Sequence, residues 1–276
     1  MQTSISDWTG SRLSLTRQGK TAVVRLFNPP HGFMDELMES ELTLALDTLE
    51  DWKDGRVVVI TGATPDMFVR HYDVSILQKR SQAMTERGKS FSVERPVPKS
   101  VIHLCIDRIE NSPLVFIAAL NGTAMGGGFE LALGCDIRIA ADTAKMAPGF
   151  AKRGILPESG GTWLLPRIVG YARAAEIAFT GRTLMADECL ELGLVNAVVP
   201  ADQLMDSVRE MAGEIASNAP LAVRAIKRMM RAAETETFEQ NVHHVFLQLL
   251  PLFRTKDFKE GVAAFIEKRP PRFIGR

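Results

Sequence analysis

The sequence is poor in cysteine and has no long apolar run. Its three cysteines, Cys105, Cys135 and Cys189, lie far apart and form no Cys-x-x-Cys pair. A sparse, odd count argues against a disulfide framework and favours a reducing compartment. No apolar stretch approaches the roughly 20 residues that cross a bilayer, and the first 20 residues contain no apolar segment of signal-peptide length. We therefore expect a soluble, cytoplasmic protein that does not contact a membrane.

An excess of positive charge is also missing. Lysine plus arginine number 33, aspartate plus glutamate number 33, and the formal net charge is zero. Nucleic acids and anionic membranes bind proteins through clustered cations, so neither is expected as a partner. The five histidines show no metal-ligand spacing with acidic or cysteine neighbours, and no metal site is expected. The 276 residues are 46% hydrophobic, which is enough for a large core.

Alternation of strand and helix patterns predicts an α/β fold for the first part of the chain. Residues 12–18 and 20–27 predict a hairpin, and residues 35–49 predict a helix that Asp35 caps. Near-continuous apolar runs predict buried parallel strands at 57–62, 114–120 and 137–142.

Two other segments differ from this alternating pattern. Residues 74–112 are charged and mixed, and we expect a poorly ordered segment there that is followed by a helix from about 99 to 111. Beyond Pro200 only helical patterns follow, at 201–217, 219–233, 235–249 and 257–268. The chain is therefore predicted to have an α/β core of residues 1–200 and a C-terminal helical region of residues 201–276.

The segment from Asn121 to Glu130 carries the clearest chemical signal. It follows a predicted strand and opens a helix, and it contains the three consecutive glycines Gly126, Gly127 and Gly128. Glycines let the backbone approach a ligand closely, and the start of a helix favours an anion. Gly127 and Glu130 are three residues apart and share a helix face. An N–H donor beside a carboxylate suits enolate chemistry, because the donor stabilises a negative oxygen while the carboxylate moves a proton.

The same residues allow two other interpretations of this segment. It could be a glycine-rich turn followed by a solvated glutamate, because short glycine motifs are weak signals by themselves. A dinucleotide-binding fingerprint fits less well, because Gly-Gly-Gly-Phe-Glu-Leu lacks the G-x-G-x-x-G spacing.

The run from Asn121 to Ala140 resembles the signature of the crotonase (enoyl-CoA hydratase/isomerase) superfamily. Further matches follow in family order over nearly the whole chain, at Gly154–Arg167, Thr180–Arg182, Glu188–Val195 and Phe258–Phe265. Within the family, the Gly-Gly-Thr-Trp-Leu-Leu-Pro-Arg run at 160–167 most resembles the ring-epoxide acyl-CoA isomerases. The resemblance implies a spiral of ββα turns, a C-terminal helical trimerisation region, and assembly as a homotrimer or a dimer of trimers.

The resemblance also implies an acyl-CoA thioester as the substrate, with coenzyme A as part of that substrate and no separate cofactor. Two backbone N–H groups of an oxyanion hole would polarise the thioester carbonyl. By position one donor is Gly127, and the other is Tyr72, because Phe68–Asp73 matches the family pattern F-x-x-G-x-D. His71 stands where the family has glycine. If that position needs the backbone conformation of glycine, histidine is strained there.

Two glutamates are the expected catalytic residues. Glu130 coincides with the first of the two glutamates of the hydratases, but Phe150 occupies the position of the second. Glu158 matches the position at which dienoyl-CoA and ring-epoxide isomerases carry an aspartate, although a residue there could also simply flank the helix that opens after Pro157. Further residues expected to contact the substrate are Phe33, Arg70, His71, Asp73, Gly126 and Phe150.

These features together predict an enzyme of the enoyl-CoA hydratase/isomerase type. Phe150 favours double-bond isomerisation or an unusual hydration geometry over simple hydration, because two carboxylates normally grip the water that is added. An acyl-CoA hydrolase or a C–C lyase of the same fold is an alternative, since a stabilised enolate serves each of these reactions. A catalytically inactive CoA-binding scaffold is an alternative from another class, and turnover of an enoyl-CoA would distinguish it.

Overall fold

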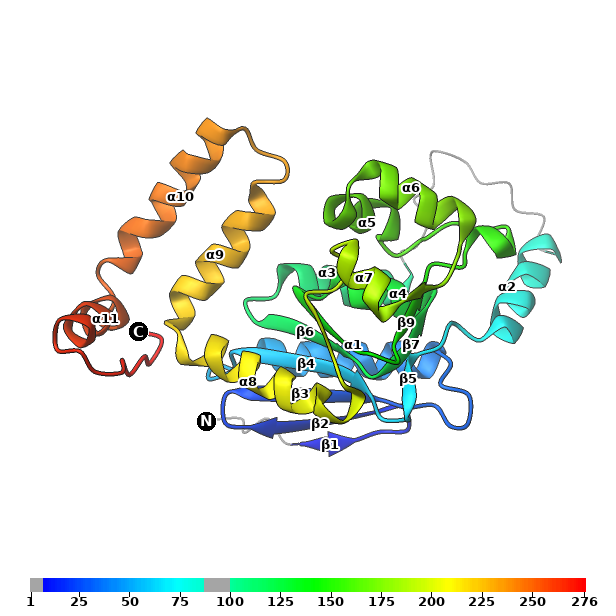
Figure 1. Ribbon diagram of the computed structural model, residues 1–276, viewed down its shortest axis with the longest axis horizontal. Helices are drawn as coiled ribbons and strands as arrows, with labels where there is room; N and C mark the ends of the chain where they lie inside the picture. Colours follow the sequence, from blue (N-terminus) through cyan, green and yellow to red (C-terminus); the bar gives the residue numbers. More distant parts are fainter. Residues whose placement is uncertain (1–6, 87–99) are drawn as a thin grey trace.

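Two β-sheets and the helices that connect their strands form the body of the protein (Figure 1). The structure is a computed structural model that describes residues 7–86 and 100–276. The larger sheet has seven strands in the order β1-β2-β3-β4-β6-β8-β11. Its strands are β1 (Trp8–Thr9), β2 (Leu13–Gln18), β3 (Thr21–Leu26), β4 (Val57–Gly62), β6 (Val115–Leu120), β8 (Ile137–Ala141) and β11 (Ala197–Val199). The smaller sheet, in the order β10-β9-β7-β5, has the strands β5 (Asp66–Val69), β7 (Gly122–Met125), β9 (Lys145–Ala147) and β10 (Leu184–Met185).

The chain visits both sheets in each turn of a spiral. From β4 it passes to β5, from β6 to β7 and from β8 to β9, and helices lead on to the next turn. Strands β3, β4, β6, β8 and β11 are parallel, and β5, β7 and β9 are parallel in the second sheet. The observed architecture is therefore the predicted α/β spiral of ββα turns.

The central strands are apolar on both faces, as parallel strands covered on two sides require. Every residue of β6 is buried, and so are the first five residues of β4. The predicted hairpin is present as β2 and β3, paired from Leu13 opposite Leu26 to Gln18 opposite Thr21.

The described part of the chain contains eleven α-helices. They are α1 (Glu36–Glu50), α2 (Val74–Glu86), α3 (Val101–Asn111), α4 (Gly127–Gly134), α5 (Gly161–Val169), α6 (Tyr171–Thr180), α7 (Ala186–Glu191), α8 (Leu204–Ser217), α9 (Pro220–Ala232), α10 (Phe238–Leu252) and α11 (Lys256–Ile266). Helix α1 begins where it was predicted, because the Asp35 carboxylate accepts a hydrogen bond from the Met38 N–H at 2.8 Å. None of the described helices is both long enough and apolar enough to cross a membrane.

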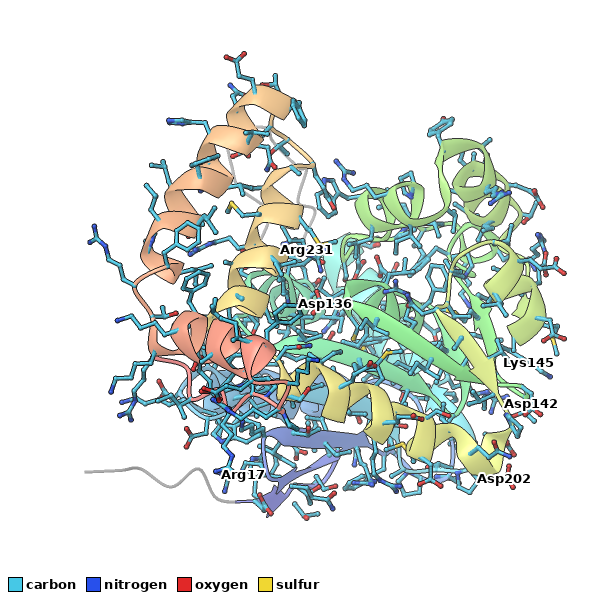
Figure 2. All side chains as sticks on the ribbon, turned by 60° about the vertical axis from the view of Figure 1, so that its left-hand side comes forward. Arg17, Asp136, Asp142, Lys145, Asp202 and Arg231 are labelled. Atoms are coloured by element: carbon cyan, nitrogen blue, oxygen red, sulfur yellow. The ribbon has the colours of Figure 1, made fainter. Side chains whose placement is uncertain are left out.

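The C-terminal helices fall into two groups. Helix α8 lies against the larger sheet, and its residues Leu204, Val208 and Ala212 belong to the buried core. Helices α9, α10 and α11 instead extend away from the body (Figures 1 and 2). No residue of α10 is buried, and Phe238 and Phe246 are 86% and 57% exposed. The predicted boundary near residue 200 stays a prediction. Helix α8 follows this boundary in the sequence but packs with the core.

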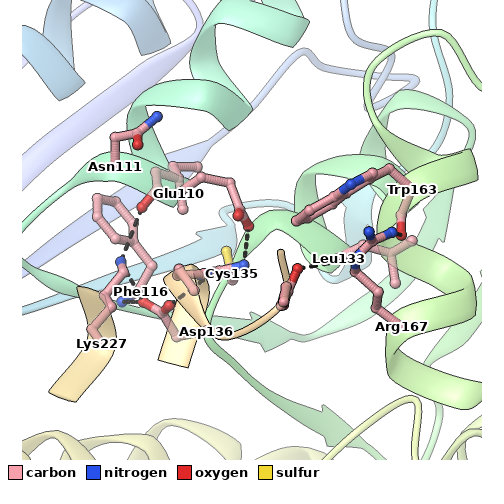
Figure 3. A network of polar contacts seen from close by, with 12 residues as sticks. Glu110, Asn111, Phe116, Leu133, Cys135, Asp136, Trp163, Arg167 and Lys227 are labelled. Atoms are coloured by element: carbon pink, nitrogen blue, oxygen red, sulfur yellow. Dashed lines mark hydrogen bonds and ion pairs between the residues drawn. The ribbon is translucent and has the colours of Figure 1, made fainter. Parts of the chain in front are cut away.

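A partly buried ionic cluster attaches α9 to the core (Figure 3). The Lys227 ammonium group lies 2.8 Å from the Asp136 carboxylate and also donates to the carbonyl oxygens of Ile109 and Leu114. Arg231 of α9 adds a second ion pair to Asp136 at 3.1 Å, and both of these residues are labelled in Figure 2. The cluster fixes the root of the projecting helices on the sheet.

One sequence prediction about local structure was wrong. Residues 74–86, predicted to be poorly ordered, form helix α2, whereas residues 87–99 of the same prediction lie outside the described residues. The helices after residue 200 agree with the prediction within a few residues at each end, which is the usual uncertainty of helix boundaries.

Candidate active site

Helix α4 presents its N-terminus at the end of strand β7. The Gly126 N–H donates to the Ala147 carbonyl at 3.0 Å, and the backbone then turns at Gly126 with φ 55° and ψ −120°. Only glycine adopts this conformation without strain. The Glu130 N–H donates back to the Gly126 carbonyl, so the N–H groups from Gly127 onward in the first turn have no acceptor within the helix. These N–H groups and the partial positive charge of the helix start favour an anion.

The loop after β5 presents a second backbone donor. A parallel bridge joins Tyr72 to Met34, in which the Met34 N–H donates to the His71 carbonyl and the Asp73 N–H donates to the Met34 carbonyl, both at 2.8 Å. In such a bridge the N–H of Tyr72 itself points away from Met34. The bridge therefore fixes the 71–72 peptide and leaves its N–H available to a ligand.

The two candidate donors line one cavity. The cavity has a volume of about 210 Å³, and its lining includes Tyr72, Gly127, Gly126, His71 and Phe150. The loop with His71 and the start of α4 lie close together, because a Cβ atom placed on Gly126 would be 3.7 Å from the Cβ of His71. This arrangement brings together the two predicted donors and three of the predicted contact residues.

Glu130 is the buried acid next to these donors. It lies in the first turn of α4 and is only 1% exposed. Its Oε1 atom accepts hydrogen bonds from the N–H groups of Ser159 at 2.9 Å and Gly161 at 2.8 Å. Burial raises the pKa of Glu130 to about 7, against the opposite effect of these two hydrogen bonds. A carboxylic acid with a pKa near neutrality is suited to both accept and donate a proton.

The segment that opens α5 holds Glu130 in place. Gly161 can donate to Glu130 at this distance because it has no side chain, since a Cβ atom there would lie 2.9 Å from Oε1. Oε1 accepts both hydrogen bonds, and Oε2 accepts none from the described residues. The carboxyl group is therefore anchored by one oxygen.

Glu158 is in the same region but differs from Glu130 in exposure. It directly precedes Ser159, and its side chain is exposed. Its charge contributes to the raised pKa of Glu130 and also acts on Glu39 of α1. Neither Glu130 nor Glu158 is among the residues that line the cavity. The two predicted acids are thus close enough to influence each other electrostatically, with no recorded hydrogen bond between them.

The other predicted contact residues have varied surroundings. Phe33 lies outside the cavity lining and stacks on the His71 ring, with 4.5 Å between the ring centroids. Asp73 accepts hydrogen bonds from the N–H and hydroxyl of Ser75 at the start of α2, which lowers its pKa. Arg70 is exposed and also lies outside the lining. Phe150, which the resemblance leads us to expect at the place of the second hydratase glutamate, lines the cavity and is 9% exposed.

The expected strain at His71 does not occur. Among the non-glycine residues that the structure describes, only Asp66 and Lys268 have a positive φ. His71 therefore needs no glycine conformation, and its ring is fixed by the stack on Phe33 and by a 2.7 Å contact between Nδ1 and the Tyr72 carbonyl oxygen.

Several residues near this site were not predicted from the sequence. Ser159 and Gly161 hold Glu130 through backbone N–H groups, and such a role leaves no mark on residue type. Lys152 and Arg153 line the cavity and carry positive charge. Glu39 is buried beside Tyr72, and the signal that could have identified it was a charged residue within the apolar face of the predicted 35–49 helix.

Comparison with known proteins agrees with this fold. The sequence profile described as Enoyl-CoA hydratase/isomerase matches residues 16–276. A carnitinyl-CoA dehydratase from Salmonella paratyphi A is 33% identical, over 96% of this chain and 98% of its own length. The structure of an enoyl-CoA hydratase from Bacillus anthracis aligns with a TM-score of 0.86 and 31% identity, over 96% of this chain and 100% of the other. A Geobacillus kaustophilus structure of the same description aligns with a TM-score of 0.88 and 29% identity, over 98% and 99% of the two chains.

The chain belongs to the enoyl-CoA hydratase/isomerase (crotonase) family of acyl-CoA-processing enzymes. The predicted family, fold and enzymatic nature are thereby confirmed. The finer resemblance to ring-epoxide isomerases is not supported, because the curated relative is named a carnitinyl-CoA dehydratase.

Proposed function

We propose that the protein binds an acyl-CoA thioester, forms its enolate, and moves protons with Glu130 and Glu158. The observation that carries the proposal is the position of Glu130, a buried acid whose pKa is raised to about 7 by burial. It lies three residues after Gly127, whose N–H has no acceptor within the helix. Tyr72 lines the same cavity as Gly127 and offers the second N–H. A thioester carbonyl oxygen placed between the two N–H groups would gain negative charge as Glu130 removes the proton at Cα.

Each step in this mechanism has a physical reason. The Glu130 carboxylate takes the Cα proton, and the electrons of the C–H bond move into the carbonyl to give an enolate. The two N–H groups stabilise the oxygen anion, and the N-terminus of α4 adds to this effect. Loss of one such donor typically lowers the rate by about 10²–10³.

The fate of the proton separates two reactions. In double-bond isomerisation, a proton returns to a more distant carbon of the acyl chain, and Glu158 is our candidate for this step. Phe150 supports isomerisation, because it gives the cavity an apolar ring where a hydratase would have its second carboxylate. Dehydration of a β-hydroxyacyl thioester is the second candidate, favoured by the name of the Salmonella relative.

The CoA moiety is expected to provide most of the binding energy. Lys152 and Arg153 line the cavity, and their charges suit the phosphates of CoA. Calorimetry should detect binding of crotonyl-CoA and no comparable binding of crotonate. Equal binding of the two compounds would contradict an acyl-CoA site.

A panel of CoA thioesters tests the reaction itself. Ultraviolet absorbance follows the conjugated thioester, and mass spectrometry identifies the product. An isomerase leaves the mass unchanged, a hydratase or dehydratase changes it by one water, and a hydrolase or C–C lyase releases a fragment. Absence of turnover with every thioester, in a protein that binds them, would favour the inactive scaffold and refute the proposal.

A further inference from the structure

A second buried glutamate, Glu39, contacts the candidate oxyanion hole from helix α1. It is 3% exposed, although the residues around it on the helix include Met38 and Leu42 of the apolar core. A buried carboxylate destabilises a fold unless hydrogen bonds compensate for its lost hydration. Among the described residues, the recorded side-chain donor to its carboxylate is the Tyr72 hydroxyl, at 3.2 Å from Oε2.

The Tyr72 side chain is held at its far end by two helices. Its hydroxyl donates to Glu39 of α1 and accepts from the Arg80 guanidinium of α2, also at 3.2 Å. The same guanidinium lies over the tyrosine ring, 5.4 Å from its centroid, and forms an ion pair with Glu36 at 2.7 Å. Glu36 and Glu39 are three residues apart and so share one face of α1. The hydroxyl therefore has one donor and one acceptor, which fixes the direction of its O–H bond.

The backbone of the same residue is the candidate donor to the thioester. The bridge to Met34 fixes the 71–72 peptide at its backbone, and the hydroxyl contacts fix the other end of the Tyr72 side chain. Rotation about the Cα–Cβ bond would leave the peptide in place, but a tilt or shift of the whole Tyr72 residue would move the peptide and the hydroxyl together. A hydroxyl that is held at the far end of the side chain therefore resists displacement of the peptide. Small displacements of a catalytic group, of about 1 Å, can lower a rate roughly 10²-fold.

We propose that Glu39 is a positioning residue, which holds the Tyr72 hydroxyl and thereby the orientation of the Tyr72 N–H toward the thioester oxygen. This inference rests on the proposed function, because it gives Glu39 a role in the same oxyanion hole. Glu39 itself does not contact the reacting atoms in this account. The Glu39 carboxylate accepts one hydrogen bond, from the Tyr72 hydroxyl.

Three variants and one control separate this role from a structural one. Tyr72→Phe removes only the hydroxyl, Glu39→Met removes the acceptor at similar size, and Glu39→Gln keeps an acceptor without charge. The control is Glu50→Met, which changes an exposed glutamate at the other end of α1. Each variant is assayed for kcat and KM with the best thioester of the panel.

A chromophoric probe reports on the oxyanion hole without turnover. The absorbance of para-dimethylaminocinnamoyl-CoA moves to longer wavelength when hydrogen bonds polarise its carbonyl group. We expect Tyr72→Phe and Glu39→Met to reduce this shift and to lower kcat by about 10–100-fold, with little change in KM. Glu39→Gln should retain most of both signals, and the control should match the wild type. The double variant should lose no more than Tyr72→Phe alone, because the hydrogen bond that Glu39→Met removes is already absent from that variant.

The possible outcomes distinguish this inference from the proposed function. If the wild type shifts the probe and turns over a thioester while Tyr72→Phe and Glu39→Met do so equally well, the positioning role is wrong and the proposed function stands. Multiplicative losses in the double variant, or a loss in Glu39→Gln as large as in Glu39→Met, would also overturn it. If the wild type neither shifts the probe nor turns over any thioester, the proposed function fails and this inference with it.

Discussion

Replacement of Glu130 by glutamine should lower activity and raise stability in alkaline solution. Glutamine keeps a carbonyl oxygen that can accept from the N–H groups of Ser159 and Gly161, so the segment that opens α5 should remain attached. It cannot accept the Cα proton. We expect kcat to fall by about 10²–10⁴, with little change in KM, because the group acts on the proton and not on the CoA moiety.

The stability effect follows from the pKa of the carboxyl group. Burial raises the pKa of Glu130 from 4.5 to about 7, which corresponds to roughly 3 kcal/mol of unfolding free energy. Below pH 4.5 the group is protonated in both the folded and the unfolded state, and this stability is fully present. As the pH rises to about 7 and beyond, the unfolded chain ionises first, and the same stability is lost. Glutamine does not titrate and avoids this loss.

Thermal unfolding at two pH values measures the effect. At pH 8 the Glu130→Gln variant should unfold at a higher temperature than the wild type, by about 2 °C or more for each kcal/mol. Near pH 4.5 the two proteins should unfold at similar temperatures. A variant that is less stable than the wild type at both pH values would show that the carboxylate is a structural anchor. A variant with wild-type kcat would refute its role as the proton carrier.

Three further predictions concern the donor turn, the second acid and the assembly. Gly126→Ala forces alanine into a conformation with φ 55°. Thermal unfolding should show a loss of about 1–3 kcal/mol in unfolding free energy. Turnover assays should show a fall in kcat of about 10²-fold or more. Glu158→Gln should lower kcat by about 10²–10⁴ at nearly constant KM, and a wild-type rate would make Glu158 a residue that only flanks α5. The exposed apolar residues of α10, including Phe246 and Leu250, should be buried between subunits, so light scattering at micromolar concentration should give a trimer or hexamer, and a monomer would contradict this.

The large strands and the capped helix were predictable because their signals are local. Continuous apolar runs identified β4, β6 and β8, and Asp35 marked the start of α1. Strands β5, β7 and β9 have only three or four residues of mixed polarity, and they form because each pairs with a strand distant in sequence. Such pairing leaves no periodic pattern within the segment itself.

The residues of the candidate site show the same contrast between local and long-range signals. Gly127 and Glu130 could be predicted because they are neighbours in one motif, and both lie on the first turn of α4. Glu39 was missed, because its relation to Tyr72 spans 33 residues and becomes visible only when α1 packs beside the loop. The anchoring of Glu130 by Gly161 spans 31 residues and uses a backbone N–H that any residue type possesses.

The central claim is that Glu130 removes a Cα proton from a thioester held by the two N–H groups. Exchange of that proton with deuterium from heavy water tests the claim directly, because it requires no second proton carrier and no particular product. A saturated acyl-CoA is incubated with the enzyme, and mass spectrometry measures the deuterium gained at Cα. We predict rapid exchange by the wild type and by Glu158→Gln, and a rate at least about 10²-fold lower for Glu130→Gln. Equal exchange by the wild type and Glu130→Gln, or none by the wild type with any CoA thioester that it binds, would contradict the account.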